Sequence, residues 1–242
     1  SGMLLVEQAR TVLREVKLLK EMASNQGKEM TGPLHIGLIP TVGPYLLPYI
    51  VPTLKETFPD LEVFLYEAQT HQLLEQLETG RLDCAIVARV PETEAFIEVP
   101  IFDEKMLLAV SEKHPWASES KIAMNTLKGQ EMLMLDDGHC LRNQALDYCF
   151  TAGAKEDSHF QATSLETLRN MVAANAGITF MPELAVLNEG TRAGVKYIPC
   201  HSPEPARTIA LVYRPGSPLR NRYERVANAI SEQVKSILAN KK

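Results

Sequence analysis

The sequence lacks several features that mark common classes of protein. No apolar run approaches the 18 or so residues that a membrane-spanning helix needs, so we expect no membrane contact. Neither a GxGxxG pattern nor a P-loop occurs, which argues against nucleotide binding. The four cysteines form no CxxC motif and no Cys/His array with zinc-ligand spacing. We therefore predict neither a structural metal nor a cofactor.

Positive charge is also scarce. The formal net charge of the 242 residues is -5, so this chain alone is not expected to hold nucleic acid, which requires clustered Lys and Arg. The first residues, SGMLLVEQARTVLREV, carry early charges and no small-residue cleavage site, unlike a signal peptide. We expect a cytoplasmic protein, in which a disulfide would be transient or sensory rather than structural.

Short apolar segments alternate with helical ones, which predicts an α/β fold with parallel strands. The first module has strands at 34–39, 61–68 and 82–88, with helices at 42–58 and 71–80. A second module begins near residue 104, with strands at 105–111, 131–136, 159–163, 178–182 and 195–199 and helices from Cys140 and Ser164. We expect the strand 207–213 and the helix 217–238 to return to the first module. The prediction is two α/β lobes joined by two crossings, 28–103 with 208–242 and 104–207, with a ligand cleft between them.

A helix is predicted over residues 3–24, ahead of the first lobe. Its apolar positions recur at alternating spacings of four and three, the pattern of a coiled-coil seam. We interpret residues 1–27 as a linker and dimerisation helix; the alternative is a helix docked on its own domain. The seam positions are Leu5, Ala9, Val12, Val16, Leu19 and Ala23.

Three strand-to-helix turns place reactive or hydrogen-bonding side chains at helix starts. Thr41 follows the first strand, Thr70 the second, and Cys140 the strand 131–136. Since ligands bind beyond the carboxyl ends of strands in such sheets, we expect these three side chains to converge. The alternative is that each threonine only caps its helix.

Cys140 has the environment of a reactive thiol. The first turn of a helix and the neighbours His139 and Arg142 favour the thiolate, while Asp136 and Asp137 oppose it. Taken without its context, a cysteine followed by Leu141 would most often be a small residue of the core.

A second cysteine, Cys149, lies nine residues after Cys140 on the same predicted helix. On an intact helix their side chains lie about 13 Å apart along the axis. A disulfide requires Cα atoms within about 7 Å, so pairing would require this helix to unwind.

Several segments together resemble the peroxide-sensing members of the LysR-type transcriptional regulators. They are GPLHIGLIPTVGPYLLP, EAQTHQLL, DGHCLRNQALDYCF, TSLETLRNMVA and LVYRPGSPLR, and the similarity runs from the first helix to about residue 230. The resemblance implies two Rossmann-like lobes of the periplasmic-binding-protein type II kind after a linker helix. It also implies a homodimer or homotetramer that binds promoter DNA through an N-terminal winged helix-turn-helix domain. That basic segment is missing from this sequence, so we expect DNA contact to need it.

The resemblance further implies a hydrogen-peroxide-sensing activator, with RNA polymerase and a thiol reductant such as glutaredoxin as partners. Peroxide would convert one cysteine to a sulfenic acid, and a reversible disulfide would then refold the segment 138–150, change the oligomer and activate antioxidant genes. The implied residues are Cys140 as peroxidatic and Cys149 as resolving cysteine, with Thr41, Thr70, His139 and Arg207 around the peroxide. Arg207 comes from the resemblance alone.

Two other interpretations explain part of the sequence. A small-ligand effector domain of the same family would account for the architecture and the threonines, but leaves the cysteine pair without a role. A thiol peroxidase would use Cys140 in repeated turnover with a reductant. We expect a regulator and not an enzyme.

Overall fold

The structure of the protein is a computed structural model that describes residues 29–187 and 194–239, together with isolated positions between residues 2 and 19. It divides into two compact units. Unit 1 comprises Ser1–Ile39, Leu46–Phe102 and Ile209–Lys242, and unit 2 comprises Pro40–Tyr45 and Asp103–Thr208. The sequence patterns place residues 40–45 in the first lobe. They belong instead with unit 2, where Thr41 bonds to Arg207 and Tyr45 to Glu166.

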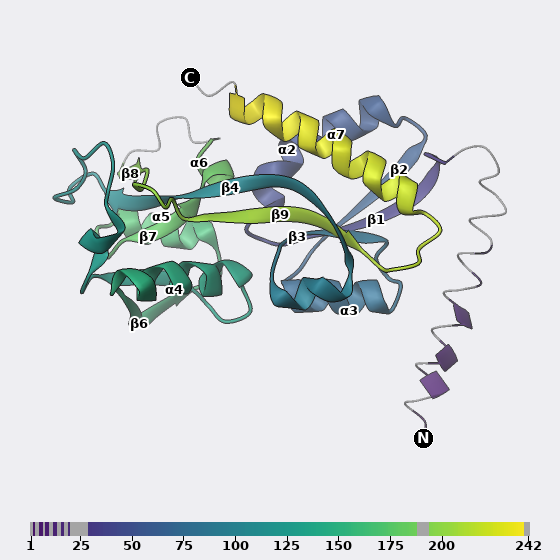
Figure 1. The fold of residues 1–242 in the computed structure, drawn as a ribbon, viewed down its shortest axis with the longest axis horizontal. Coiled ribbons are helices and arrows are strands. Elements are labelled where there is room, and N and C mark those ends of the chain that lie inside the picture. The colour runs from purple at the N-terminus through teal and green to yellow at the C-terminus, as the bar shows by residue number, and fades with distance from the viewer. Residues whose placement is uncertain are drawn as a thin grey trace. The chain divides into compact units, whose positions relative to one another are not determined.

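The strands of unit 1 follow the order β2-β1-β3-β9 within a seven-stranded sheet. β1 pairs in parallel with both β2 and β3, as the alternation of strands and helices predicts, whereas β9 returns antiparallel to β3. Helices α7 and α2 lie on one side of these strands and α3 on the other (Figure 1). The strands are β1 Gly32–Leu38, β2 Leu61–Glu67, β3 Cys84–Ala88 and β9 Ala206–Tyr213; the helices are α2 Gly43–Thr57, α3 Thr70–Glu78, α7 Arg220–Ala239 and the 3-10 helix η1 Pro91–Ala95.

Close packing of α3 on this sheet depends on Gly37 of β1. A Cβ atom at that position would lie 2.6 Å from the side chain of Leu73 on α3 and 2.7 Å from that of Leu82. Both leucines are fully or almost fully buried. A larger residue at position 37 would therefore push α3 away from β1.

Unit 2 combines an antiparallel group of strands with a parallel pair. β4 pairs antiparallel with β7 and with β8, while β5 and β6 are parallel and are connected by α4. No pairing direction was predicted from the sequence for β4, β7 and β8, and the structure shows that it is antiparallel. The strands are β4 Ile97–Ser111, β5 Glu131–Leu135, β6 Lys155–Ala162, β7 Thr179–Pro182 and β8 Val195–Ile198; the helices are α4 Cys140–Ala152, α5 Leu165–Ala173, α6 Glu183–Leu187 and the 3-10 helix η2 Met124–Leu127.

The described positions of the N-terminal segment are helical and exposed. The seam residues Leu5, Val12 and Leu19 are 71%, 53% and 64% exposed. Pairing of this seam with a partner helix stays a prediction. Ala23, the last seam position, lies outside the described residues. Within the part of the chain that the structure describes, no helix has the length and apolarity to cross a membrane.

Candidate functional site

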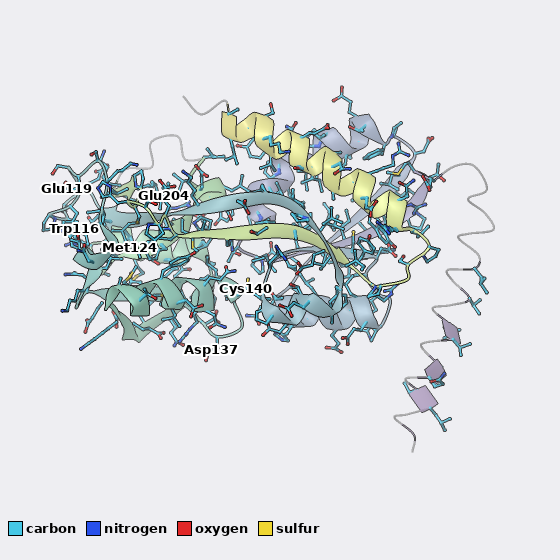
Figure 2. All side chains as sticks on the ribbon, in the orientation of Figure 1. Trp116, Glu119, Met124, Asp137, Cys140 and Glu204 are labelled. Carbon is cyan, nitrogen blue, oxygen red and sulfur yellow. The ribbon has the colours of Figure 1, made fainter. Side chains whose placement is uncertain are left out.

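Cys140 is the first residue of α4 and follows a tight turn from β5. Gly138 in this turn has φ of 94°, a left-handed conformation that favours glycine. The turn brings the chain directly from the end of β5 into the helix. Figure 2 shows Cys140 at the start of α4, with Asp137 in the turn before it. The predicted position of this thiol in a first helical turn is therefore confirmed.

The four cysteines differ in burial. Cys140 is 9% exposed, whereas Cys84 and Cys149 are 0% and Cys200 is 1% exposed. Burial raises the pKa of Cys149 to about 12 and, with the nearby charge of Glu204, that of Cys200 to about 11. Burial and then the charge of Asp83 raise the pKa of Cys84 well above its ordinary value. Cys84, Cys149 and Cys200 are therefore protonated near neutral pH, and Cys140 is the most exposed of the four.

Cys149 lies further along the same continuous helix, and both cysteines are free thiols. Its Sγ is 3.0 Å from the Sδ atom of Met132 on β5, inside the core of unit 2. At 1.5 Å per residue, nine residues of helix separate the two cysteines by about 13 Å along the axis. The helical spacing predicted from the sequence is confirmed, and this form of α4 cannot hold a Cys140–Cys149 disulfide.

Polar contacts hold α4 near both of its ends. Near its start, the Arg142 guanidinium donates through Nη2 to both carboxylate oxygens of Glu156 on β6, at 2.8 and 2.9 Å. Near its end, the Tyr148 hydroxyl donates to the carbonyl of Ala206 at 2.9 Å and accepts the Ala206 N–H at 3.2 Å. Ala206 begins β9 and immediately precedes Arg207. The helix that carries both thiols is thus tied to the strand that carries a predicted peroxide-binding residue.

His139 immediately precedes Cys140 and is buried. Its Nε2 lies 3.2 Å from Oδ1 of Asp136, an ion-pair distance when the imidazole is protonated. Its carbonyl accepts the Arg142 N–H at 3.0 Å, so the backbone before the cysteine is fixed to the first turn of α4. Asp136 thus holds the imidazole of the residue next to Cys140, and its assistance to the thiol stays a prediction.

Thr41 and Arg207 are 166 positions apart in the sequence but in direct contact. Nη1 of Arg207 donates to Thr41 Oγ1 at 2.9 Å, and Nη2 to the Thr41 carbonyl at 3.1 Å. The Nε and Nη2 edge of the guanidinium binds Glu104, whose Oε2 lies 2.8 Å from Nε and 2.7 Å from Nη2. All three residues are at most 4% exposed. Two of the six predicted site residues therefore form one buried hydrogen-bonded group.

Thr70 occupies the first position of α3 in unit 1. Its side chain is buried, and its hydroxyl makes no hydrogen bond to any residue that the structure describes. The other five predicted site residues belong to unit 2. The convergence of Thr70 with them stays a prediction.

Three residues that contact the site were missed by the sequence analysis: Glu104, Tyr148 and Glu156. Only Glu104 leaves a signal in the sequence. It occupies an inward position of β4 between the buried residues Phe102 and Met106, where the alternation calls for an apolar side chain. A carboxylate at such a position requires a buried cationic partner. Tyr148 and Glu156 resemble ordinary surface residues.

Comparison with known proteins assigns the family. The sequence model of the LysR substrate binding domain matches residues 27–235. A hydrogen peroxide-inducible genes activator of Haemophilus influenzae is 92% identical over 238 residues, which are 98% of this chain and 79% of that protein. The chain belongs to the OxyR-type LysR regulators. Solved structures of the oxidized and the reduced form of OxyR are 64% and 61% identical, each with a TM-score of 0.79, and each match covers 86% of this chain and 98% of the other.

Membership of the OxyR-type regulators confirms the predicted fold class, with lobes of the periplasmic-binding-protein type II kind. The relative from H. influenzae is named as a gene activator, not as an enzyme, so the expectation of a regulator holds and the thiol-peroxidase interpretation is set aside. The family match itself tests none of the six site residues, and their roles stay predictions.

Proposed function

We propose that this chain is the hydrogen-peroxide-sensing part of a LysR-type transcriptional activator, with Cys140 and Cys149 as its redox pair. The observation that carries the proposal is α4, which presents two free thiols that cannot meet while the helix is intact. The relatives named for peroxide induction, and the existence of an oxidized and a reduced form of OxyR, support it.

The first step is attack by the Cys140 thiolate on one oxygen of hydrogen peroxide. The S–O bond forms as the O–O bond breaks, so the sulfur is oxidised to a sulfenic acid and hydroxide leaves, which solvent then protonates. Thr41 and Arg207 orient the peroxide through hydrogen bonds, and His139 donates to the leaving oxygen. The first-turn position of Cys140 places the thiolate at the positive end of the helix dipole.

The second step joins the two cysteines. Once α4 unwinds, the sulfur of Cys149 attacks the sulfenic sulfur, a disulfide forms and water leaves, which is a reversible stage of cysteine oxidation. Because burial raises the pKa of Cys149 to about 12, this thiol stays protonated and unreactive until it leaves the core. Cys140 is therefore oxidised first.

The new conformation of residues 138–150 changes the assembly of the regulator. We propose a homodimer or homotetramer that acts in the cytoplasm, binds promoter DNA through an N-terminal winged helix-turn-helix domain and engages RNA polymerase. A thiol reductant such as glutaredoxin would restore the two thiols. The exposed seam that includes Leu5, Val12 and Leu19 supports pairing through the first helix.

Mass spectrometry after addition of one equivalent of peroxide, in buffer without reductant, tests the proposal. We expect a linked peptide that joins Cys140 and Cys149, and in Cys149→Ser a sulfenic acid on Cys140 that reacts with dimedone. Cys84→Ser serves as the matched control, because its buried thiol takes no part. A Cys140 that remains a thiol, or the absence of the linked peptide, would refute the proposal and favour a small-ligand effector domain, to be sought by calorimetry with metabolites.

A further inference from the structure

Glu104 is a buried carboxylate that the proposed chemistry leaves without a role. It is 1% exposed and uses both of its oxygens. Oε2 accepts from Arg207, and Oε1 accepts the N–H of Leu184 at 3.0 Å, near the start of α6. A buried ion is stable only when it is paired and hydrogen-bonded, so Glu104 and Arg207 hold each other in one arrangement.

This arrangement fixes the direction of the hydrogen bond at Thr41. A guanidinium has donors and no acceptor, so in the 2.9 Å contact Oγ1 of Thr41 must accept from Arg207. The hydroxyl hydrogen of Thr41 then points to some other acceptor. A donation from a cation into Oγ1 also polarises the hydroxyl and makes it a stronger donor.

From this chain of contacts we infer that Glu104 is a positioning residue for the peroxide reaction: through Arg207 it presents the Thr41 hydroxyl as a hydrogen-bond donor to peroxide. The inference rests on the proposed function. When the thiolate of Cys140 attacks one oxygen, the S–O bond forms, the O–O bond breaks and the other oxygen leaves as hydroxide. Preorganised donors stabilise the negative charge that develops on a leaving oxygen. Without Glu104, the guanidinium is free to turn away and Thr41 can rotate.

The test compares two reactions of the same thiol. The rate constant of Cys140 oxidation by hydrogen peroxide depends on how peroxide is oriented, whereas its alkylation by iodoacetamide depends only on the thiolate and on access to it. Both are measured at neutral pH in a Cys149→Ala background, so that only the first step is observed. The readout is the peroxide rate constant divided by the alkylation rate constant. A general loosening of unit 2 would change both rate constants and leave this ratio unchanged.

The variant Glu104→Gln keeps the shape of the side chain and removes its charge. We expect the peroxide rate constant to fall about tenfold or more, as for the loss of an oriented donor, while alkylation stays within about twofold. Combined with Thr41→Val, it should add little to the loss caused by Thr41→Val alone, because both act through the same hydroxyl. The matched control is Glu98→Gln, which removes another arginine-paired carboxylate, in unit 1. It should leave the ratio unchanged.

Two results would overturn the inference: a ratio of the two rate constants that is unchanged in Glu104→Gln, whether or not both rates fall, or fully additive effects with Thr41→Val. Should Glu104→Gln fail to fold, Glu104→Asp retains the buried charge with a shorter reach, and an unchanged ratio there has the same meaning. A background protein whose Cys140 does not react with peroxide at all would instead refute the proposed function.

Discussion

The Tyr148 hydroxyl offers a direct test of whether α4 must unwind for the disulfide to form. Tyr148 precedes Cys149 and bonds to both backbone groups of Ala206. If oxidation pulls Cys149 out of the core, Tyr148 loses these two hydrogen bonds in the disulfide form but keeps them in the dithiol form. The variant Tyr148→Phe preserves the ring and removes both bonds. It should therefore destabilise the dithiol form alone.

The size of the effect follows from the two bonds. Each contributes about 0.5–1.5 kcal/mol net, and water can reach the partly exposed Ala206 in the variant, so the total is about 1–3 kcal/mol. For a two-electron couple, 1.4 kcal/mol corresponds to about 30 mV. Since the disulfide becomes relatively more stable, we expect the reduction potential of the Cys140–Cys149 couple to become more negative by about 20–60 mV.

The potential is measured by equilibrating the protein with thiol–disulfide buffers of graded ratio, trapping free thiols by alkylation and quantifying them by mass spectrometry. Tyr213→Phe is the matched control, since its hydroxyl donates to Glu224 at 3.4 Å in unit 1 and should affect stability without moving the potential. An unchanged or less negative potential in Tyr148→Phe would mean that Tyr148 keeps its bonds to Ala206 after oxidation. The reasoning that α4 opens through residue 149 would then be wrong.

Two further predictions concern the same helix. Replacing Arg142 with Met removes the ion pair with Glu156 that holds the start of α4, worth about 1–3 kcal/mol. Because α4 then unwinds more easily, the conversion of the Cys140 sulfenic acid to the disulfide should be faster in stopped-flow experiments. A slower conversion would contradict this prediction. Burial raises the pKa of Cys149 from about 8.5 in the unfolded chain to about 12, so its protonated thiol favours the folded state below pH 8.5. This contribution should fall by about 1.4 kcal/mol per pH unit above 8.5. In denaturant titrations with reductant present, wild type should lose stability with rising pH faster than Cys149→Ala, and parallel curves would contradict this.

Local sequence patterns were sufficient for most elements but not for how distant strands pair. The strands predicted at 34–39, 61–68 and 82–88 all form, because short apolar runs between helical segments determine βαβ units. The first half of β4, which contains Pro100 and several charges, was missed, as was α6, which is only five residues long. The antiparallel return of β9 was also missed, since no local periodicity encodes the direction of a partner strand.

In the candidate site, too, local features could be predicted from the sequence and long-range contacts could not. The place of Cys140 at the start of a helix follows from the turn DDGH and could be predicted locally. The contact between Thr41 and Arg207 joins residues 166 positions apart, and only resemblance to a family suggested it. A buried partner for Glu104 could have been predicted from the sequence, because an inward-facing charge on a strand requires one. The sequence does not identify that partner as Arg207.

The contacts of α4 also explain how a covalent bond can act as a reversible signal. Closing a loop of about ten residues costs about 2.5–3 kcal/mol of chain entropy, which formation of the S–S bond must offset. Three features of the intact helix oppose the disulfide form as well, each worth about 1–3 kcal/mol: the Arg142–Glu156 pair, the two bonds of Tyr148 and the burial of Cys149. The disulfide form therefore persists only while the S–S bond is intact, and reduction of the disulfide suffices to restore the helix. It follows that a single substitution at any of these contacts should shift the balance between the dithiol and disulfide forms by about 1–3 kcal/mol.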